Sequence, residues 1–140
     1  MSGLQRFLDA QDEVYATALA ELKAGDKRTH WMWFVFPQMR GLGFSSNAQF
    51  YGIASLEEAR AYLAHEVLGA RLLACTQAVL GVQGKSLETI LGAVDARKFR
   101  SSMTLFLHAS GEPMFRAALD RYCDGAEDGK TLALLQAVQK

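Results

Sequence analysis

The stretch Thr29-His-Trp-Met-Trp-Phe-Val-Phe-Pro37 decides whether the chain folds as an all-helical or a mixed structure. Its aromatic residues and valine favour a β-strand, but the stretch is apolar on every face, so periodicity cannot distinguish strand from helix. Thr29 can cap a short helix, and Pro37 can end it because the residue before a proline avoids the α region. A single strand would lack pairing partners among helices. We therefore predict a short buried helix, with Trp33 and Phe36 in the core.

On both sides of this stretch, apolar residues recur at helical spacing. One helix is predicted from Leu4 to Leu22, with Ser2 and Gln5 at the spacing of a capping box and Gly25 as its end. Later helices start at a capping residue or a turn, namely Ser55, Ser86, Asp95, 111–113 and Asp128. The pattern gives seven or eight short helices and no strand–helix alternation. The predicted fold class is therefore all-α, as one multihelical domain over residues 1–140.

The composition limits the classes of protein to which the chain can belong. Of its 140 residues, 50% are apolar and 21% are charged, so the chain can bury a core without disulfides or metals. Its 15 lysines and arginines balance its 15 aspartates and glutamates. This balance argues against bulk electrostatic capture of nucleic acid or of an anionic membrane. We expect neither as a partner.

The cysteines and the N-terminus indicate a cytoplasmic protein. Cys75 and Cys123 form no C-x-x-C motif and no cluster with zinc spacing, so we expect reduced thiols. The first ten residues lack the apolar segment of a signal peptide. The longest strongly apolar run, 31–36, is far shorter than the roughly 20 residues that span a bilayer. We expect a monomer without metal or cofactor, and the sequence leaves a dimer open.

The segment from Pro37 to Ala54 loses helical periodicity and is rich in glycine and serine. Structureless loops longer than roughly 12–15 residues are uncommon in compact domains and are often functional. The aromatic residues Phe44, Phe50 and Tyr51 are expected to pack this loop against the core.

Within that segment, the stretch Arg40-Gly-Leu-Gly-Phe-Ser-Ser46 matches the dinucleotide-binding fingerprint only superficially. Ser46 stands where the fingerprint has its third glycine. In addition, no clear strand is predicted before the stretch and no helix directly after it. Its backbone donors and hydroxyls suit an anion, although a plain glycine turn that lets the loop pack is the favoured explanation. Arg40 offers a guanidinium fork for phosphate or carboxylate. We expect the 37–52 segment to line the main polar pocket with Arg40 directed into it. The alternative is that Arg40 pairs with an acid such as Asp95 and staples the loop.

A second group of polar residues lies at the predicted helix start after Asp95. Arg97, Lys98 and Arg100 are cations where the helix dipole prefers anions, which marks either a site or a solvated face. The expected ligand is small and anionic or nucleotide-like. Its predicted contacts are Arg40, Gly41, Gly43, Ser45, Ser46, Tyr51, Lys98 and Ser101.

The sequence leaves open whether the protein is an enzyme. His30 and His65 flank the glycine-rich segment and are candidate acid/base residues for hydrolase-type chemistry, because histidine titrates near neutral pH. With His108, they have no local metal-binding spacing. The alternative function is a protein-interaction module without catalytic activity, in which the long loop or the basic helix start contacts a partner.

Five blocks of sequence are distinctive, namely His30-Trp-Met-Trp-Phe34, Phe36-Pro-Gln38, Gly41-Leu-Gly43, Tyr51-Gly-Ile53 and Ser101-Ser-Met-Thr-Leu-Phe106. Together they resemble the domain-of-unknown-function family 1810 over nearly the whole chain. The resemblance implies a small, mainly α-helical domain and no established activity, so it supplies no catalytic residues. Some members carry the name calpastatin, but the inhibitory regions of calpastatin are disordered repeats, and this sequence is non-repetitive.

Overall fold

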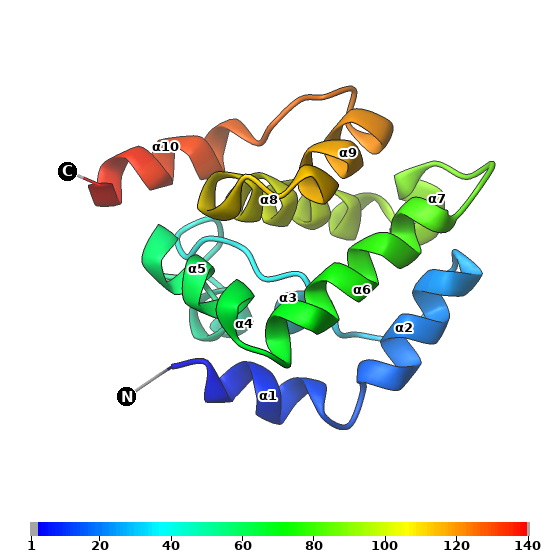
Figure 1. Cartoon of the computed structure of the whole chain (residues 1–140), viewed down its shortest axis with the longest axis horizontal. Helices are drawn as coiled ribbons and strands as arrows, with labels where there is room; N and C mark the ends of the chain where they lie inside the picture. The colour runs from blue at the N-terminus through cyan, green and yellow to red at the C-terminus, as the bar shows by residue number, and fades with distance from the viewer. Residues whose placement is uncertain (1–2, 140) are drawn as a thin grey trace.

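The computed structural model describes residues 3–139, and within that range the chain forms ten helices and no β-strand (Figure 1). The helices are α1 (Gln5–Gln11), α2 (Tyr15–Ala24), α3 (Met32–Val35), α4 (Ser46–Phe50), α5 (Leu56–Ala64), α6 (Leu68–Gly81), α7 (Leu87–Leu91), α8 (Ala93–Ser110), α9 (Pro113–Tyr122) and α10 (Gly129–Gln139). The predicted all-α class is confirmed. No helix in residues 3–139 combines the length and the apolar character needed to cross a bilayer.

The longest helix, α8, is the centre of the fold. It packs against α5, α7, α9 and α10, and Figure 1 shows it between α9 and α10 on one side and α5 and α6 on the other. Every residue from 101 to 106 is buried, so this stretch of α8 has no solvent face. Val94 and Arg97 in its first turns are exposed. The first turns of α8 are therefore accessible to a ligand.

The prediction of a short helix between Trp31 and Phe36 is confirmed by α3. Trp31 and Phe36 are 1% and 0% exposed, and the Phe36 ring meets Phe99 of α8 edge-on with centroids 5.1 Å apart. Trp33 is only half-buried, so its predicted place in the core is wrong. Residues two positions apart on a helix do not share a face, and burial of Trp31 leaves Trp33 nearer the surface.

The single helix predicted between Leu4 and Leu22 is two helices, α1 and α2, with a turn at 12–14. Both helices keep apolar residues toward the core, so the turn leaves the hydrophobic spacing intact and periodicity cannot reveal it. Gln11 at the end of α1 is buried and donates from Nε2 to the Phe34 carbonyl at 2.7 Å. Ser2, the predicted capping residue, lies outside the described residues.

Three of the predicted capping residues act as caps. The hydroxyls of Ser55 and Ser86 and the carboxylate of Asp128 each accept a hydrogen bond from the backbone N–H three residues later. Asp95 is not a cap, because α8 begins two residues earlier, after Gly92. The Asp95 carboxylate instead lies 2.8 Å from the ammonium nitrogen of Lys27 and 3.3 Å from that of Lys98.

The connection from α2 to α3 is organised by the carboxylate of Glu21. It accepts hydrogen bonds from the backbone N–H groups of Arg28 and Thr29, from the Thr29 hydroxyl and, at 2.9 Å, from Nε1 of Trp31. Burial alone would raise the pKa of Glu21, but these donors outweigh it and lower the pKa from 4.5 to about 2. The charged carboxylate is therefore the form that the fold stabilises.

Glu21→Gln should lower the free energy of unfolding at pH 7 by about 1–3 kcal/mol, because an amide oxygen cannot satisfy four donors as a carboxylate does. The pKa of Glu21 is lowered by folding, so its contribution is present above pH 4.5 and is lost as the pH falls toward 2. Urea melts of both proteins at pH 7 and in acid measure this, and the difference between them should shrink in acid. If the two proteins differ in free energy of unfolding by the same amount at both pH values, the charge of Glu21 does not contribute to stability.

The two tryptophans of α3 should differ in their contributions to stability. Trp31→Ala should cost about 3–5 kcal/mol, because it removes a fully buried aromatic side chain. Trp33→Ala should cost about 1 kcal/mol, as is typical of a partly exposed position. Chemical denaturation of both variants measures the two losses. A loss at Trp33 as large as that at Trp31 would place Trp33 in the core after all.

Candidate functional site

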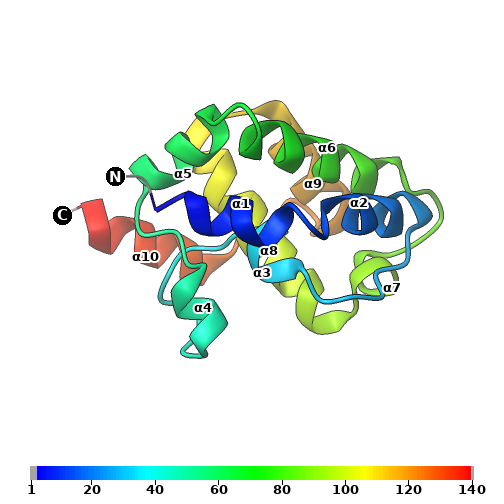
Figure 2. The same ribbon diagram turned by 90° about the horizontal axis from the view of Figure 1, so that it is seen from below.

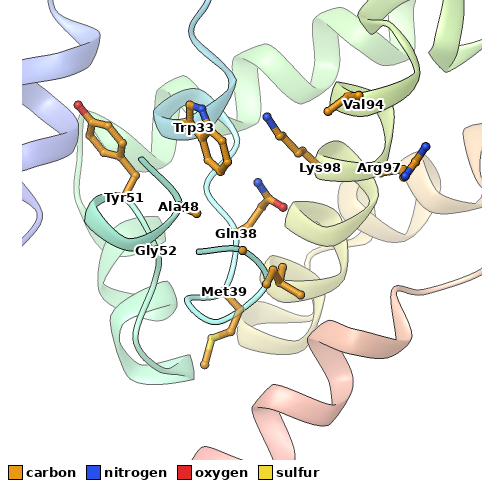
Figure 3. A pocket seen from close by; sticks show the side chains of 11 residues that line it. Trp33, Gln38, Met39, Ala48, Tyr51, Gly52, Val94, Arg97 and Lys98 are labelled. Atoms are coloured by element: carbon orange, nitrogen blue, oxygen red, sulfur yellow. The ribbon is translucent and has the colours of Figure 1, made fainter. Parts of the chain in front are cut away.

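A cavity of about 210 Å³ opens between the 37–52 segment and the first turns of α8. We call it the aromatic lobe. Figure 3 shows Trp33, Gln38 and Lys98 reaching toward one another across it, from α3, the following segment and α8. The residues that line it are Trp33, Gln38, Met39, Leu42, Gly43, Ala48, Tyr51, Gly52, Val94, Arg97 and Lys98. Its walls are therefore mostly apolar, with a few polar groups that converge.

A second, wider hollow of about 590 Å³ adjoins the first and shares Gln38, Leu42, Arg97 and Lys98 with it. We call it the basic lobe, and the two lobes together the cleft. The basic lobe continues to Arg100, Ser101, Asp128, Gly129 and Lys130. Four of its lining residues are cations and one is a carboxylate, although the whole chain has no net charge. Positive charge is thus concentrated at this place.

The wall of the aromatic lobe is an ordered segment. Its ends are joined by two parallel backbone hydrogen bonds of 2.8 Å, from the Arg40 N–H to the Ile53 carbonyl and from the Ile53 N–H to the Gln38 carbonyl. Between them α4 begins after Ser45, whose hydroxyl accepts from the Ala48 N–H at 3.1 Å. We expected residues 37–54 to form a loop with no helix starting after Ser46, and this expectation is wrong. A helix of five residues is too short to show periodicity, and its cap is the signal that sequence reasoning missed.

The prediction that all three aromatic residues of this segment pack against the core is correct only for Tyr51. The Tyr51 ring lies against Phe7 and Phe34. Phe44 and Phe50 are 89% and 57% exposed. Phe44 lies just before the Ser45 cap and Phe50 is the last residue of α4, which projects from the body of the molecule (Figure 2). The segment is held by Tyr51 and by hydrogen bonds.

The hydrogen bonds come from two arginines. Arg40 donates from Nε to the Gln49 carbonyl at 3.1 Å and from Nη2 to the Gly52 carbonyl at 3.0 Å. Arg6 of α1 donates to the Phe50 carbonyl at 2.7 Å and to the same Gly52 carbonyl at 3.0 Å. The carbonyls at the end of a helix lack partners within it, so the two guanidinium groups satisfy the end of α4.

Arg40 therefore does not line the cleft, and the prediction that it points into the pocket is wrong. The alternative, in which Arg40 holds the loop by pairing with an acid such as Asp95, is correct in part. Arg40 does hold the segment in place, but by hydrogen bonds to backbone carbonyls. Asp95 pairs instead with Lys27 and Lys98.

The remaining candidate ligand-binding residues divide into two sets. Gly43, Tyr51 and Lys98 line the aromatic lobe, and Ser101 lines the basic lobe. Gly41, Ser45 and Ser46 do not line either lobe. Gly41 has a φ of 108° and lies against Leu134 of α10, Ser45 is a cap, and Ser46 is the exposed first residue of α4.

The histidines proposed for acid/base chemistry are also outside the cleft. His30 is exposed, and His65 caps α6 by accepting at Nδ1 from the backbone N–H groups of Val67 and Leu68 at 3.2 and 3.3 Å. The cysteines offer no nucleophile there, because burial raises the pKa of the Cys75 thiol to about 12 and also raises that of Cys123. Residues 3–139 contain no group of three or more His, Cys, Asp or Glu side chains that could hold a metal ion.

Most cleft residues were not among the predicted ligand contacts, and Trp33, Gln38, Arg97 and Lys130 are the main ones. The cluster of cations after Asp95 did signal the place. The expected conflict with the helix dipole is wrong, because α8 begins at Ala93 and Arg97 and Lys98 lie beyond its first turn. Lys98 has its ammonium nitrogen 3.8 Å from the centre of the Trp33 ring, so one face of the indole is covered by a cation. Nothing in the sequence indicates that Gln38 faces these groups.

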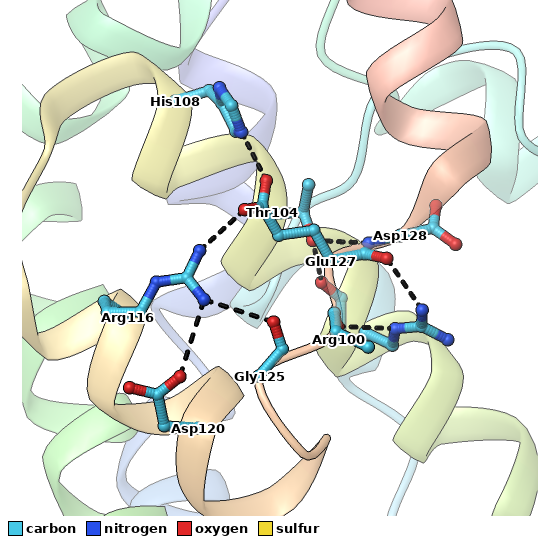
Figure 4. Close-up of polar contacts among 9 residues, drawn as sticks. Arg100, Thr104, His108, Arg116, Asp120, Gly125, Glu127 and Asp128 are labelled. Carbon is cyan, nitrogen blue, oxygen red and sulfur yellow. Dashed lines mark hydrogen bonds and ion pairs between the residues drawn. The ribbon is translucent and has the colours of Figure 1, made fainter.

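The floor of the basic lobe is held by a polar network at the start of α10 (Figure 4). Arg100 donates to the carbonyls of Ala126 and Glu127 at 2.9 and 2.7 Å. The Glu127 carboxylate lies 2.5 Å from Nε2 of His108 and 2.6 Å from Nη2 of Arg116. The hydrogen bond with His108, together with Arg116, lowers the pKa of Glu127. These contacts fix the chain just before Lys130.

Comparison with known proteins adds a family and a relative of known structure. The family described as "Protein of unknown function (DUF1810)" matches residues 1–135. The crystal structure of the conserved hypothetical protein Rv1873 from Mycobacterium tuberculosis is similar, with 55% sequence identity and a TM-score of 0.94. The match covers 95% of this chain and 96% of that one. No curated protein matches.

Arg40→Ala should destabilise the fold by about 1 kcal/mol, because two carbonyls lose a charged donor while Arg6 still holds Gly52. Amide hydrogen exchange should rise in the 37–53 segment and stay unchanged in α9, which serves as the internal control. Unchanged exchange in 37–53 would show that Arg40 does not hold the segment in place.

Proposed function

This chain belongs to the DUF1810 family, and we propose that it binds a small anionic ligand in the cleft between the 37–52 segment and α8. The observation that carries the proposal is the concentration of four cations around one carboxylate in the basic lobe of a chain without net charge. A concave site lined by charges of one sign attracts ligands of the opposite sign.

The state of these charged groups supports binding. Within residues 3–139, the side chains of Arg97 and Lys130 have no ion-pair partner. The one carboxylate in the lobe, Asp128, is engaged at the start of α10, where it accepts from the N–H and the hydroxyl of Thr131 at 3.0 and 2.5 Å. Two cations are thus left to meet a ligand, without a competing acid that is free to pair with them.

The shape of the cleft supports a small molecule as the ligand. Ligand pockets are concave and mostly apolar, with a few polar groups that converge, and the aromatic lobe has this character. Neither candidate acid/base histidine lines the cleft. The proposal is therefore one of binding and includes no catalytic step.

A protein-interaction module is the alternative function, and the exposure of Phe44 and Phe50 favours it. Exposed apolar surface is a feature of contact sites for other proteins. This alternative does not need the cations of the cleft. It therefore predicts that anions have no effect on stability.

Thermal unfolding in the presence of inorganic phosphate, pyrophosphate and sugar phosphates tests the proposal. A ligand at about 100 times its Kd adds about 2.7 kcal/mol, which should raise Tm by roughly 5–10 °C for a chain of this size. The Arg97→Ala, Lys130→Ala double variant should lose the shift. Lys23→Ala, an exposed cation on α2, is the matched control and should keep it.

Two outcomes would contradict anion binding in the cleft. In one, no anion raises Tm by more than about 1 °C, which is less than 0.5 kcal/mol of stabilisation for a chain of this size. In the other, the shift survives in the double variant, and the anion binds elsewhere.

A further inference from the structure

We infer that the anion is one end of a larger ligand, a phosphomonoester of a planar heterocycle, with its ring in the aromatic lobe and its phosphate in the basic lobe. The inference rests on the proposed function and adds the chemical class of the ligand.

The sizes of the two lobes indicate a ligand in two parts. Pockets that bury a whole drug-sized ligand have volumes of about 300–1,000 Å³, and the aromatic lobe, at about 210 Å³, is smaller. It joins the basic lobe, of about 590 Å³, through four shared residues. One molecule can therefore place a compact group in the first lobe and extend into the second.

The lining of the aromatic lobe suits a flat ring with polar edges. Trp33 supplies an aromatic wall, and Met39, Leu42 and Ala48 supply apolar surface. The side-chain amide of Gln38 has no hydrogen-bond partner within residues 3–139 and reaches into the cavity (Figure 3). An amide presents donors and an acceptor together, which matches the ring nitrogens and exocyclic groups of a heterocycle better than it matches a hydrocarbon.

Lys98 lies where the two lobes meet. Its ammonium group lies over the Trp33 ring at 3.8 Å and 3.3 Å from Asp95, and an ammonium has three donors. Asp95 also pairs with Lys27 at 2.8 Å, so its negative charge is balanced and does not repel an anion strongly. Lys98 can thus keep its contact with the indole and donate to a phosphate.

The basic lobe suits a phosphate better than a carboxylate. Arg100 is held by the carbonyls of Ala126 and Glu127, whereas Arg97 and Lys130 make no ion pair within residues 3–139. A phosphomonoester carries about −1.5 to −2 charges and three strong acceptor oxygens. It can therefore engage Arg97, Lys98 and Lys130 at once, which a singly charged carboxylate does less well.

Isothermal titration calorimetry with three kinds of probe tests the inference: inorganic phosphate, the common nucleosides and their 5′-monophosphates. At least one monophosphate should bind at least about tenfold more tightly than either of its parts. Lys130→Ala should weaken the monophosphate and phosphate by about fivefold and leave the nucleoside unchanged. Trp33→Ala and, as a variant that keeps the packing, Gln38→Leu should weaken the monophosphate and the nucleoside but not phosphate. Lys23→Ala should change none of them.

If phosphate binds and no monophosphate binds more tightly than phosphate, the inferred heterocycle is wrong and anion binding stands. If Trp33→Ala and Gln38→Leu leave monophosphate affinity unchanged, the ring does not occupy the aromatic lobe, and the inference is overturned. If neither phosphate nor any monophosphate binds, the inference fails together with the proposed function.

Discussion

The burial of α8 on every side between residues 101 and 106 is the constraint on which the rest of the structure depends. Helices α5, α7, α9 and α10 can share one central helix because residues 101–106 offer apolar or small polar side chains in all directions. The Thr104 hydroxyl, for example, donates to the Arg100 carbonyl at 2.8 Å. No residue from 101 to 106 is charged. Asp95, Arg97, Lys98 and Arg100 precede this stretch, where the helix reaches the surface.

The three cations of α8 at the cleft differ in what they contact. Arg97, Lys98 and Arg100 are the fifth, sixth and eighth residues of α8, beyond the first turn in which the helix macrodipole acts. Arg100 holds the chain before α10, and Lys98 covers Trp33 and pairs with Asp95. The side chain of Arg97 has no ion pair within residues 3–139. A bound anion would provide one.

The opposite wall of the cleft, formed by the 37–52 segment, is held in place by hydrogen bonds. Two guanidinium groups, from Arg6 and Arg40, converge on the Gly52 carbonyl. Position 52 has to be glycine, because a Cβ there would lie 2.7 Å from the Cα of Arg40 and 2.8 Å from the Ala48 carbonyl oxygen. The wall is therefore held in place before any ligand arrives, which reduces the ordering cost of binding.

Helix caps and apolar spacing sufficed to predict the class of fold, because Ser55, Ser86 and Asp128 act locally and need no tertiary context. They did not suffice for the site. Whether Trp31 or Trp33 faces the core depends on how α3 packs against the other helices, and both lie in the same apolar run. Arg40 looked like a ligand-binding residue because a guanidinium that satisfies backbone carbonyls has no sequence signature. The cluster of three cations between residues 97 and 100 was the local signal that indicated the cleft.

Chemical-shift mapping tests the location of the site most directly. Isotope-labelled protein is titrated with inorganic phosphate, and the backbone amide resonances are followed residue by residue. The largest changes should occur in residues 37–43, 94–101 and 128–130, which form the two walls and the floor of the cleft. Changes confined to other parts of the chain, or no changes at saturating phosphate, would contradict the assignment of the cleft as the anion-binding site.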